Sequence, residues 1–221
     1  MQTRTGAVEN QGPAVDTIAG LVDWIVSKAE GRDRFIVAFA GPPAAGKSTI
    51  AARIVDELRS KGERTSSIAM DGFHYDDAVL DRLGLRSRKG SPPTFDVAGF
   101  EVLLKRLRAG EPDVAIPHFD RSLELSRAAA ELISADTKFL IVEGNYLLLD
   151  YAPWTSLRPL YDMTVLLDVP VEELDRRLVA RWDHYGRDRE EARKWIDMND
   201  LPNIRHVLEH SNVTDIRYTP T

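Results

Sequence analysis

The chain has 221 residues, 43% of them hydrophobic, with no cysteine and a net charge of −6 at pH 7. This length suits one domain with a buried core. The missing cysteines exclude disulfides and thiolate metal sites, and they fit a reducing compartment such as the cytoplasm. The acidic balance argues against general nucleic-acid binding. No apolar run approaches membrane-spanning length, so we expect no membrane insertion.

The N-terminal half begins without a regular pattern. Residues 1–12 have no apolar stretch of the kind found in secretory signals, and we expect them to form a flexible tail. Apolar residues at helical spacing predict a helix over 13–30, closed by a glycine. The apolar run Phe35–Ala40 predicts a buried strand, and Ile50–Leu58 predicts a helix.

A phosphate-binding motif lies between that strand and that helix. Residues 41–49 read GPPAAGKST, which satisfies the P-loop pattern G-x-x-x-x-G-K-[ST]. Backbone N–H groups and the helix N-terminus of such a loop surround a polyphosphate. Lys47 places a charge near the outer phosphates, and the Ser48 hydroxyl can bind Mg²⁺. The predicted nucleotide-binding residues are Gly41, Pro42, Pro43, Ala44, Ala45, Gly46, Lys47, Ser48 and Thr49.

Further elements follow in alternation. We predict strands over 65–70, 138–142, 163–168 and 215–218, and helices over 76–85, 97–108, 171–185, 190–198 and 202–210. Residues 86–93 and 149–160 are interpreted as loops, 113–116 as extended and 117–125 as irregular, while 126–134 give no clear pattern. The alternation indicates a three-layer α/β P-loop NTPase fold, with a five-stranded parallel sheet covered by helices on both faces. We expect one domain over 13–221, with a small helical lid near 177–200.

Two acidic residues come directly after predicted strands. Asp71 follows the second strand and Glu143 follows the third. Ligands of open α/β sheets bind at such strand ends. The Asp71 carboxylate can accept the proton of an attacking hydroxyl during γ-phosphoryl transfer, although a turn-capping role is the alternative. Glu143 can hold Mg²⁺ through water, or it can be a solvated loop acid.

Five sequence blocks in a fixed order carry a family resemblance. GPPAAGKS, MDGFHY, RKGSPPTFD, PHFDRS and VEGNYLLL resemble the uridine kinase, phosphoribulokinase and bacterial pantothenate kinase superfamily. The chain is most similar to a branch described as fructose-transport-system kinases and nucleoside-kinase-like proteins, over about 33–217. This resemblance implies phosphoryl transfer from ATP, with Mg²⁺, to a hydroxyl of a small-molecule acceptor. A homo-oligomer such as a dimer is compatible with it.

The resemblance also implies roles for single residues. It makes Asp71, Lys47, Glu143 and Arg181 catalytic, and it places Ser48, Glu143 and Asp71 at the metal. Arginines of the lid would close over the phosphates, because a guanidinium meets phosphate oxygens in pairs; these are Arg177, Arg181 and Arg187. A solvated helix face paired with nearby glutamates is the alternative for each. The residues on the acceptor side would be Asp71, Phe73, His74, Tyr75, Arg88, Lys89, His118, Asp120 and Asn145.

Several readings of the acceptor and of the function stay open. Resemblance to the fructose-type branch favours a sugar or polyol such as fructose, with a uridine-type nucleoside or pantothenate as the alternative. A different class, a regulatory NTP-binding module associated with a transport system, would use the same P-loop. A motor or helicase is disfavoured, because the short acidic chain shows no basic stacking groove. Trp182 and Trp195 are interpreted as packing residues, and Asn199, Asp200 and Asn203 as caps, turn residues or ligand contacts.

Overall fold

A parallel sheet forms the centre of the structure, a computed structural model that describes residues 17–211 and 213–220. The predicted tail over 1–12 lies outside the described residues. The sheet has five strands in the order β2–β5–β1–β6–β7, all parallel. Their bounds are β1 Phe35–Ala40, β2 Thr65–Ala69, β5 Phe139–Gly144, β6 Met163–Leu167 and β7 Ile216–Tyr218. The predicted five-stranded parallel sheet is therefore confirmed.

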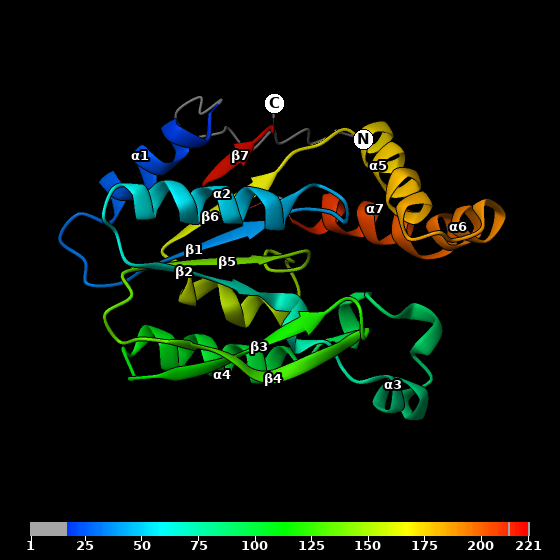
Figure 1. The fold of residues 1–221 in the computed structure, drawn as a ribbon, viewed down its shortest axis with the longest axis horizontal. Helices are drawn as coiled ribbons and strands as arrows, with labels where there is room; N and C mark the ends of the chain where they lie inside the picture. The colour runs from blue at the N-terminus through cyan, green and yellow to red at the C-terminus, as the bar shows by residue number, and fades with distance from the viewer. Residues whose placement is uncertain (1–16, 212, 221) are drawn as a thin grey trace, which may run out of the picture.

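Helices cover both faces of this sheet (Figure 1). Successive side chains of a strand point to opposite faces, and all six residues of β1 are buried. Phe35, Val37 and Phe39 pack in the apolar cluster of one face, whereas Ile36 and Ala38 pack in the other. The first cluster is covered by α1 (Ile18–Lys28), α2 (Lys47–Ser60) and α5 (Val171–His184). The second is covered by α4 (Val97–Arg108) and the 3₁₀ segment Trp154–Leu160.

The remaining helical segments lie toward the carboxyl ends of the strands. They are α3 (Asp77–Leu83), α6 (Arg189–Trp195), α7 (Leu201–His210) and the short 3₁₀ segments Met70–Phe73, Arg86–Arg88 and Pro92–Thr94. A π-helical turn, Ile196–Asp200, joins α6 directly to α7. Single π turns of this kind occur often at functional sites. No helix in the described part of the chain is long and apolar enough to cross a membrane.

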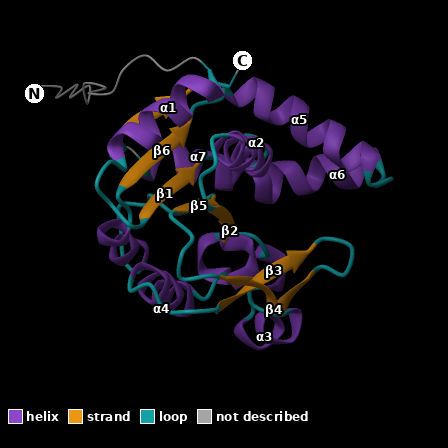
Figure 2. Ribbon diagram, turned by 60° about the vertical axis from the view of Figure 1, so that its left-hand side comes forward, coloured by secondary structure: helices purple, strands orange, loops and turns teal. Residues whose placement is uncertain are grey.

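A two-stranded antiparallel ribbon, which the sequence did not predict, stands apart from the main sheet and beside α3 (Figure 2). It is formed by β3 (Val114–Asp120) and β4 (Leu125–Ile133). Between the pairs Ile116–Glu131 and His118–Arg127 the register shifts, so that three residues of β4 lie opposite Pro117. Proline cannot donate to a strand ladder and is tolerated at such a bulge. The interpretation of 117–125 as irregular is therefore wrong for 117–120 and for Leu125, which are strand residues, whereas 121–124 form the turn between the strands.

Two smaller differences concern segment type and boundaries. Residues 154–160 form a 3₁₀ helix rather than the loop that the prolines predicted. Two of its side chains, Trp154 and Leu157, are buried in the core. Helix α2 begins at Lys47, within the motif as predicted, and so extends three residues beyond the N-terminal end of the apolar pattern at Ile50–Leu58. The helix therefore opens inside the P-loop motif, where its free N–H groups can bind a phosphate.

Candidate active site

The P-loop owes its shape to two glycines. Gly46 lies in the left-handed region with φ +89° and is the N-cap of α2. A side chain there would strain the backbone. At Gly41 a Cβ would lie 3.0 Å from the Cβ of Leu167, closer than ordinary side-chain contacts allow. The loop can therefore bring its backbone N–H groups close to a ligand.

Lys47 is buried beneath the loop. The residue is only 9% exposed, and its Nζ donates a hydrogen bond of 3.0 Å to the carbonyl of Pro42. Burial lowers the pKa of Lys47 to about 8, against the opposing attraction of Glu143 and Asp71. A polyphosphate near the ammonium would favour its charged form.

A hydroxyl and a buried carboxylate lie together next to the loop. The Ser48 Oγ donates a hydrogen bond of 2.9 Å to Glu143 Oε1. Burial raises the pKa of Glu143, and the nearby negative charge of Asp71 raises it further. A divalent cation would relieve this repulsion, so the residues fit Mg²⁺. Among the described residues no group of three or more acidic, histidine or cysteine side chains could hold a metal. Mg²⁺ usually keeps waters and phosphate oxygens among its ligands.

Asp71 has a partner that the sequence did not indicate. The 3₁₀ segment after β2 positions Asp71, and its Oδ2 forms an ion pair of 2.9 Å with Nη2 of Arg121. Arg121 comes from the turn between β3 and β4. The ribbon thus places a guanidinium directly on the carboxylate that was predicted to accept the proton.

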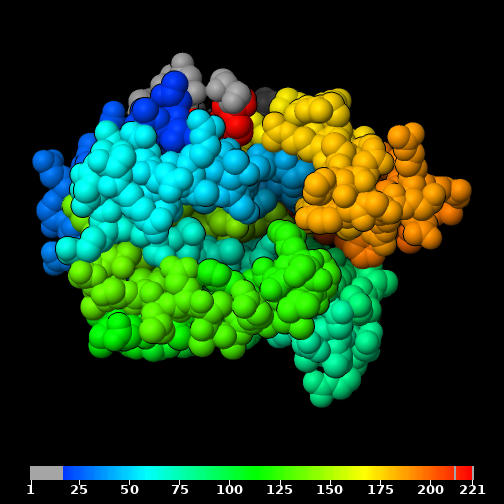
Figure 3. Space-filling model, in the orientation of Figure 1, coloured from blue at the N-terminus to red at the C-terminus, as the bar shows by residue number. Residues whose placement is uncertain are grey.

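One cavity of about 610 Å³ brings most of the predicted site together. Its walls come from the P-loop, the strand ends, the α5–α6 region and the β3–β4 turn, and the last two approach each other on the right of Figure 3. The predicted residues that line it are Pro43, Ala44, Gly46, Lys47, Ser48, Thr49, Asp71, His74, Lys89, Glu143, Asn145, Arg177 and Arg181.

Other predicted residues do not line this cavity. The Pro42 carbonyl accepts hydrogen bonds from Lys47 Nζ and from the Ala45 N–H, and Ala45 is buried. The ring of Phe73 packs on Phe100 at 4.8 Å between centroids, and Arg88 donates to the carbonyl of Met198 at 3.1 Å. Tyr75 and Arg187 also lie outside the lining. The full set outside it is Gly41, Pro42, Ala45, Phe73, Tyr75, Arg88, His118, Asp120 and Arg187.

Strand alternation explains the position of His118 and Asp120. Both flank Phe119 on β3, and Phe119 is the residue that lines the cavity. Neighbouring side chains on a strand point to opposite faces. The Nε2 of His118 instead lies 3.1 Å from Glu131 Oε2, and Asp120 accepts hydrogen bonds within its own turn.

The lid arginines have three different environments. The Nε of Arg177 donates to Glu173 Oε1 at 2.7 Å, and its Nη1 reaches the Ala45 carbonyl of the P-loop at 3.3 Å. Arg181 lines the cavity and lies over the ring of Trp182, and no acidic side chain among the described residues is within ion-pair distance of it. Arg187 lies over the rings of both Trp182 and Trp195, at 4.8 and 5.2 Å, and so helps to hold the lid together.

The π-helical turn and the first turn of α7 supply a polar wall. Asn199 and Asn203 are each only 3% exposed, and both line the cavity together with Asp200. Asn199 donates from Nδ2 to the Lys89 carbonyl at 3.0 Å, while its buried Oδ1 has no hydrogen-bond partner among the described residues. Burial raises the pKa of Asp200, which accepts a hydrogen bond of 3.2 Å from Trp182 Nε1. Trp182 lines the cavity as well, so it does more than pack.

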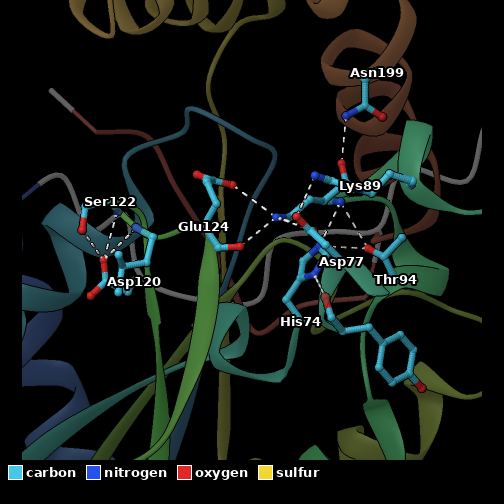
Figure 4. A network of polar contacts seen from close by, with 12 residues as sticks. His74, Asp77, Lys89, Thr94, Asp120, Ser122, Glu124 and Asn199 are labelled. Atoms are coloured by element: carbon cyan, nitrogen blue, oxygen red, sulfur yellow. Dashed lines mark hydrogen bonds and ion pairs between the residues drawn. The ribbon is translucent and has the colours of Figure 1, made fainter. Parts of the chain in front are cut away.

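His74 fixes the loop that carries Lys89 (Figure 4). Its Nδ1 lies 2.8 Å from the carbonyl of Tyr75, and the Gly90 N–H donates to its Nε2 at 3.1 Å. Nδ1 must therefore carry the proton, and Nε2 must be an acceptor. Burial lowers the pKa of His74, which favours this neutral form. Because backbone groups occupy both ring nitrogens, His74 supports the loop rather than presenting a free nitrogen to a ligand.

Comparisons with known proteins match this arrangement. A model of the phosphoribulokinase / uridine kinase family matches residues 36–210. An uncharacterized protein of Escherichia coli is 31% identical over 185 residues, which are 83% of this chain and 76% of that protein. A protein of Schizosaccharomyces pombe named "putative uridine kinase" is 29% identical over 219 residues, 95% of this chain and 93% of that protein.

A pantothenate kinase of Limosilactobacillus reuteri is 28% identical over 218 residues, 85% of this chain and 70% of that protein. Among solved structures, a "putative fructose transport system kinase" from Silicibacter sp. superimposes with a TM-score of 0.88 at 34% identity, covering 92% of this chain and all of that one. The P-loop, the fold around it and these matches show that the chain belongs to the phosphoribulokinase / uridine kinase family and is a small-molecule kinase.

Proposed function

We propose that this kinase transfers the γ-phosphoryl group of Mg-ATP to a hydroxyl of a small polyhydroxylated metabolite, with a sugar or polyol such as fructose favoured. One observation carries the proposal: Asp71 lines the same cavity as Lys47, Ser48 and Glu143. The cavity can therefore hold a phosphate chain and a reacting alcohol side by side. The similarity to a structure named as a fructose transport system kinase supports the sugar or polyol.

In this mechanism the acceptor hydroxyl gives its proton to Asp71 while its oxygen attacks the γ-phosphorus. The bond from the γ-phosphorus to the β–γ bridging oxygen breaks, and ADP leaves. Lys47 and Arg181 stabilise the charge that develops on the phosphate oxygens, and Arg177 would act from the lid. Ser48 and Glu143 would hold Mg²⁺, which supplies further charge neutralisation at the β- and γ-phosphates. Arg121 orients the Asp71 carboxylate through their ion pair.

The replacement Asp71→Asn tests this assignment. The amide keeps the size of the side chain but cannot take up the proton, so we expect transfer to fall by about 10²- to 10⁴-fold. ATP affinity, measured by calorimetry in the presence of Mg²⁺, should change little. An Asn variant with near-normal turnover would remove Asp71 from the role of base.

A panel of acceptors tests the substrate class. Fructose, sorbitol, uridine and pantothenate are each incubated with Mg-ATP, and ADP release is measured. Relatives named uridine kinase and pantothenate kinase make these two acceptors the alternatives. Slow ADP release that is independent of every acceptor would instead favour the regulatory NTP-binding module. The single domain over 13–221 with its lid near 177–200, the cytoplasmic location and the dimer remain predictions.

A further inference from the structure

We propose that Glu124 and Asp77 neutralise Lys89, so that the acceptor subsite selects uncharged acceptors over their carboxylate or phosphate counterparts. This inference rests on the proposed function, because it concerns the acceptor of that reaction. It makes Glu124 a residue that determines specificity. Neither a motif nor a spacing singles out Glu124 in the sequence, whereas Lys89 belongs to a block in which a cation was expected to face the acceptor.

The contacts of Lys89 carry the first step (Figure 4). Its Nζ lies 2.9 Å from Asp77 Oδ1 and 3.4 Å from Glu124 Oε2, and it donates a hydrogen bond of 2.9 Å to the Glu124 carbonyl. A lysine ammonium has three donors and no acceptor. Three protein oxygens therefore lie within 3.4 Å of the ammonium, and the Glu124 carbonyl accepts a hydrogen bond from it. The side chain is only 13% exposed, which leaves little of its charge for a ligand.

The charges around this contact balance. Asp77 also forms an ion pair of 2.6 Å with Arg86 through its other oxygen. Two cations, Arg86 and Lys89, thus face two anions, Asp77 and Glu124. We call these four residues the Lys89 clasp. Its net charge is zero, so an anionic acceptor gains no attraction from it.

The position of the clasp places it on the acceptor side. Lys89 and Glu124 line the cavity next to Phe119, whose ring lies 5.6 Å from the Lys89 ammonium. These residues come from the loop after α3 and from the β3–β4 turn, while the phosphate-binding residues come from the N-terminus of α2. An alcohol that reacts at Asp71 would extend toward the clasp.

Two polar groups that line the same cavity accept hydrogen bonds, and this also favours an uncharged, hydroxyl-bearing substrate. Asn199 Oδ1 is buried without a partner among the described residues, and Asp200 offers carboxylate oxygens. Both are hydrogen-bond acceptors, and a buried polar atom without a partner costs free energy. Hydroxyl groups can donate to them. A carboxylate or a phosphate dianion brings only further acceptors.

The other cations of the cavity are committed elsewhere. Arg121 pairs with Asp71, and Arg177 pairs with Glu173. Arg181 lies close enough to Lys47 that its positive charge lowers the pKa of the lysine. This proximity places Arg181 on the phosphate side of the cavity. Among the described residues that line the cavity, the two cations nearest the acceptor side, Lys89 and Arg121, each have an acidic partner.

Matched pairs of ligands test the proposal by calorimetry in the presence of ADP and Mg²⁺. Sorbitol is compared with gluconate, and fructose with fructose 6-phosphate. The wild-type protein should bind the neutral member of each pair at least about tenfold more tightly. In Glu124→Gln, which leaves Lys89 in part unneutralised, that ratio should fall by about five- to tenfold.

Two further variants control for side effects. Lys89→Gln in the Glu124→Gln background should restore the preference, because the freed charge is then gone. Glu111→Gln removes one negative charge from an exposed residue outside the cavity and should leave the ratio unchanged. Glutamine at position 124 adopts the local φ of +54° as readily as glutamate does, and the side chain is 62% exposed. The variant should therefore fold normally.

Three results would overturn the inference: tighter wild-type binding of the anionic members, an unchanged ratio in Glu124→Gln, or no binding of any of the four ligands. Phosphoryl transfer is measured separately. If the binding ratio follows the expectation but no acceptor is phosphorylated, the proposed function fails and the charge selectivity stands. If transfer occurs without charge selectivity, only the role of Glu124 fails.

Discussion

Replacing the P-loop lysine should stabilise the protein while it removes activity. Lys47 is buried, and its pKa is lowered from the ordinary value of 10.5 to about 8. The interval corresponds to about 3 kcal/mol at roughly 1.36 kcal/mol per pH unit. This is the cost of holding the ammonium charged in the nucleotide-free fold below pH 8. Methionine has a similar length and no charge, but it removes one of the two donors to the Pro42 carbonyl, which keeps only the Ala45 N–H; the lost hydrogen bond costs about 1 kcal/mol.

We therefore expect Lys47→Met to raise the free energy of unfolding by about 2 kcal/mol at pH 7, measured by urea denaturation without nucleotide. The pH dependence has a definite sign. The unfolded lysine binds its proton more tightly than the folded one, so wild-type stability should rise between about pH 8 and 10.5. The methionine variant should lack this rise.

In the presence of Mg-ATP the wild-type protein should become more stable than Lys47→Met. Mg-ATP stabilises the folded wild-type protein by RT ln(1 + [L]/Kd), where [L] is the nucleotide concentration. Lys47→Met should lose most of this effect together with phosphoryl transfer. Lys105→Met is the matched control, because Lys105 is 58% exposed and lies on α4 far from the P-loop. Its unfolding free energy should change by less than about 0.5 kcal/mol. A nucleotide-free Lys47→Met protein that is less stable than wild type would refute the reasoning.

Three further variants probe other parts of the structure. Trp154→Ala should lower the free energy of unfolding by about 3–5 kcal/mol, because Trp154 is 2% exposed and packs on Phe95 and Tyr146. A loss under about 1 kcal/mol in urea denaturation would contradict this packing. Arg121→Gln should lower kcat with little change in ATP affinity, since Arg121 touches Asp71 rather than the P-loop; steady-state kinetics that show a raised KM for ATP alone would argue against it. Gly46→Ala should lower the free energy of unfolding by about 1–2 kcal/mol and weaken Mg-ATP binding, because alanine is strained at the φ of +89° found there. An unchanged ATP affinity in calorimetry would contradict the expected effect on the loop.

Local patterns were enough to predict the main sheet and the P-loop. The strand Phe35–Ala40 is an unbroken apolar run, and the motif that follows it has a fixed spacing. The ribbon was missed for an equally local reason. Pro117 interrupts the expected alternation of β3, and β4 contains three consecutive alanines, which favour strands poorly.

The site was predictable only where a residue is tied to a motif. Lys47 and Ser48 belong to the P-loop, and Asp71 directly follows a strand. Arg121 reaches Asp71 across 50 positions of sequence, and only the fold of the ribbon makes this contact. Trp182 shows the same limit, because its ring suits packing as well as a cavity wall and sequence spacing does not distinguish the two.

The bulge in the ribbon has a consequence for solubility. Each strand of a two-stranded ribbon has one side whose backbone groups are not paired within the ribbon, and flat free edges of this kind recruit strands from other molecules. At Pro117 the register breaks, and Ala129 opposite it lies in the left-handed region with φ +51°. Charged Arg127 and Glu131 flank this break. An irregular, charged edge is a poor template for intermolecular pairing, so this arm can extend over the active site without promoting aggregation.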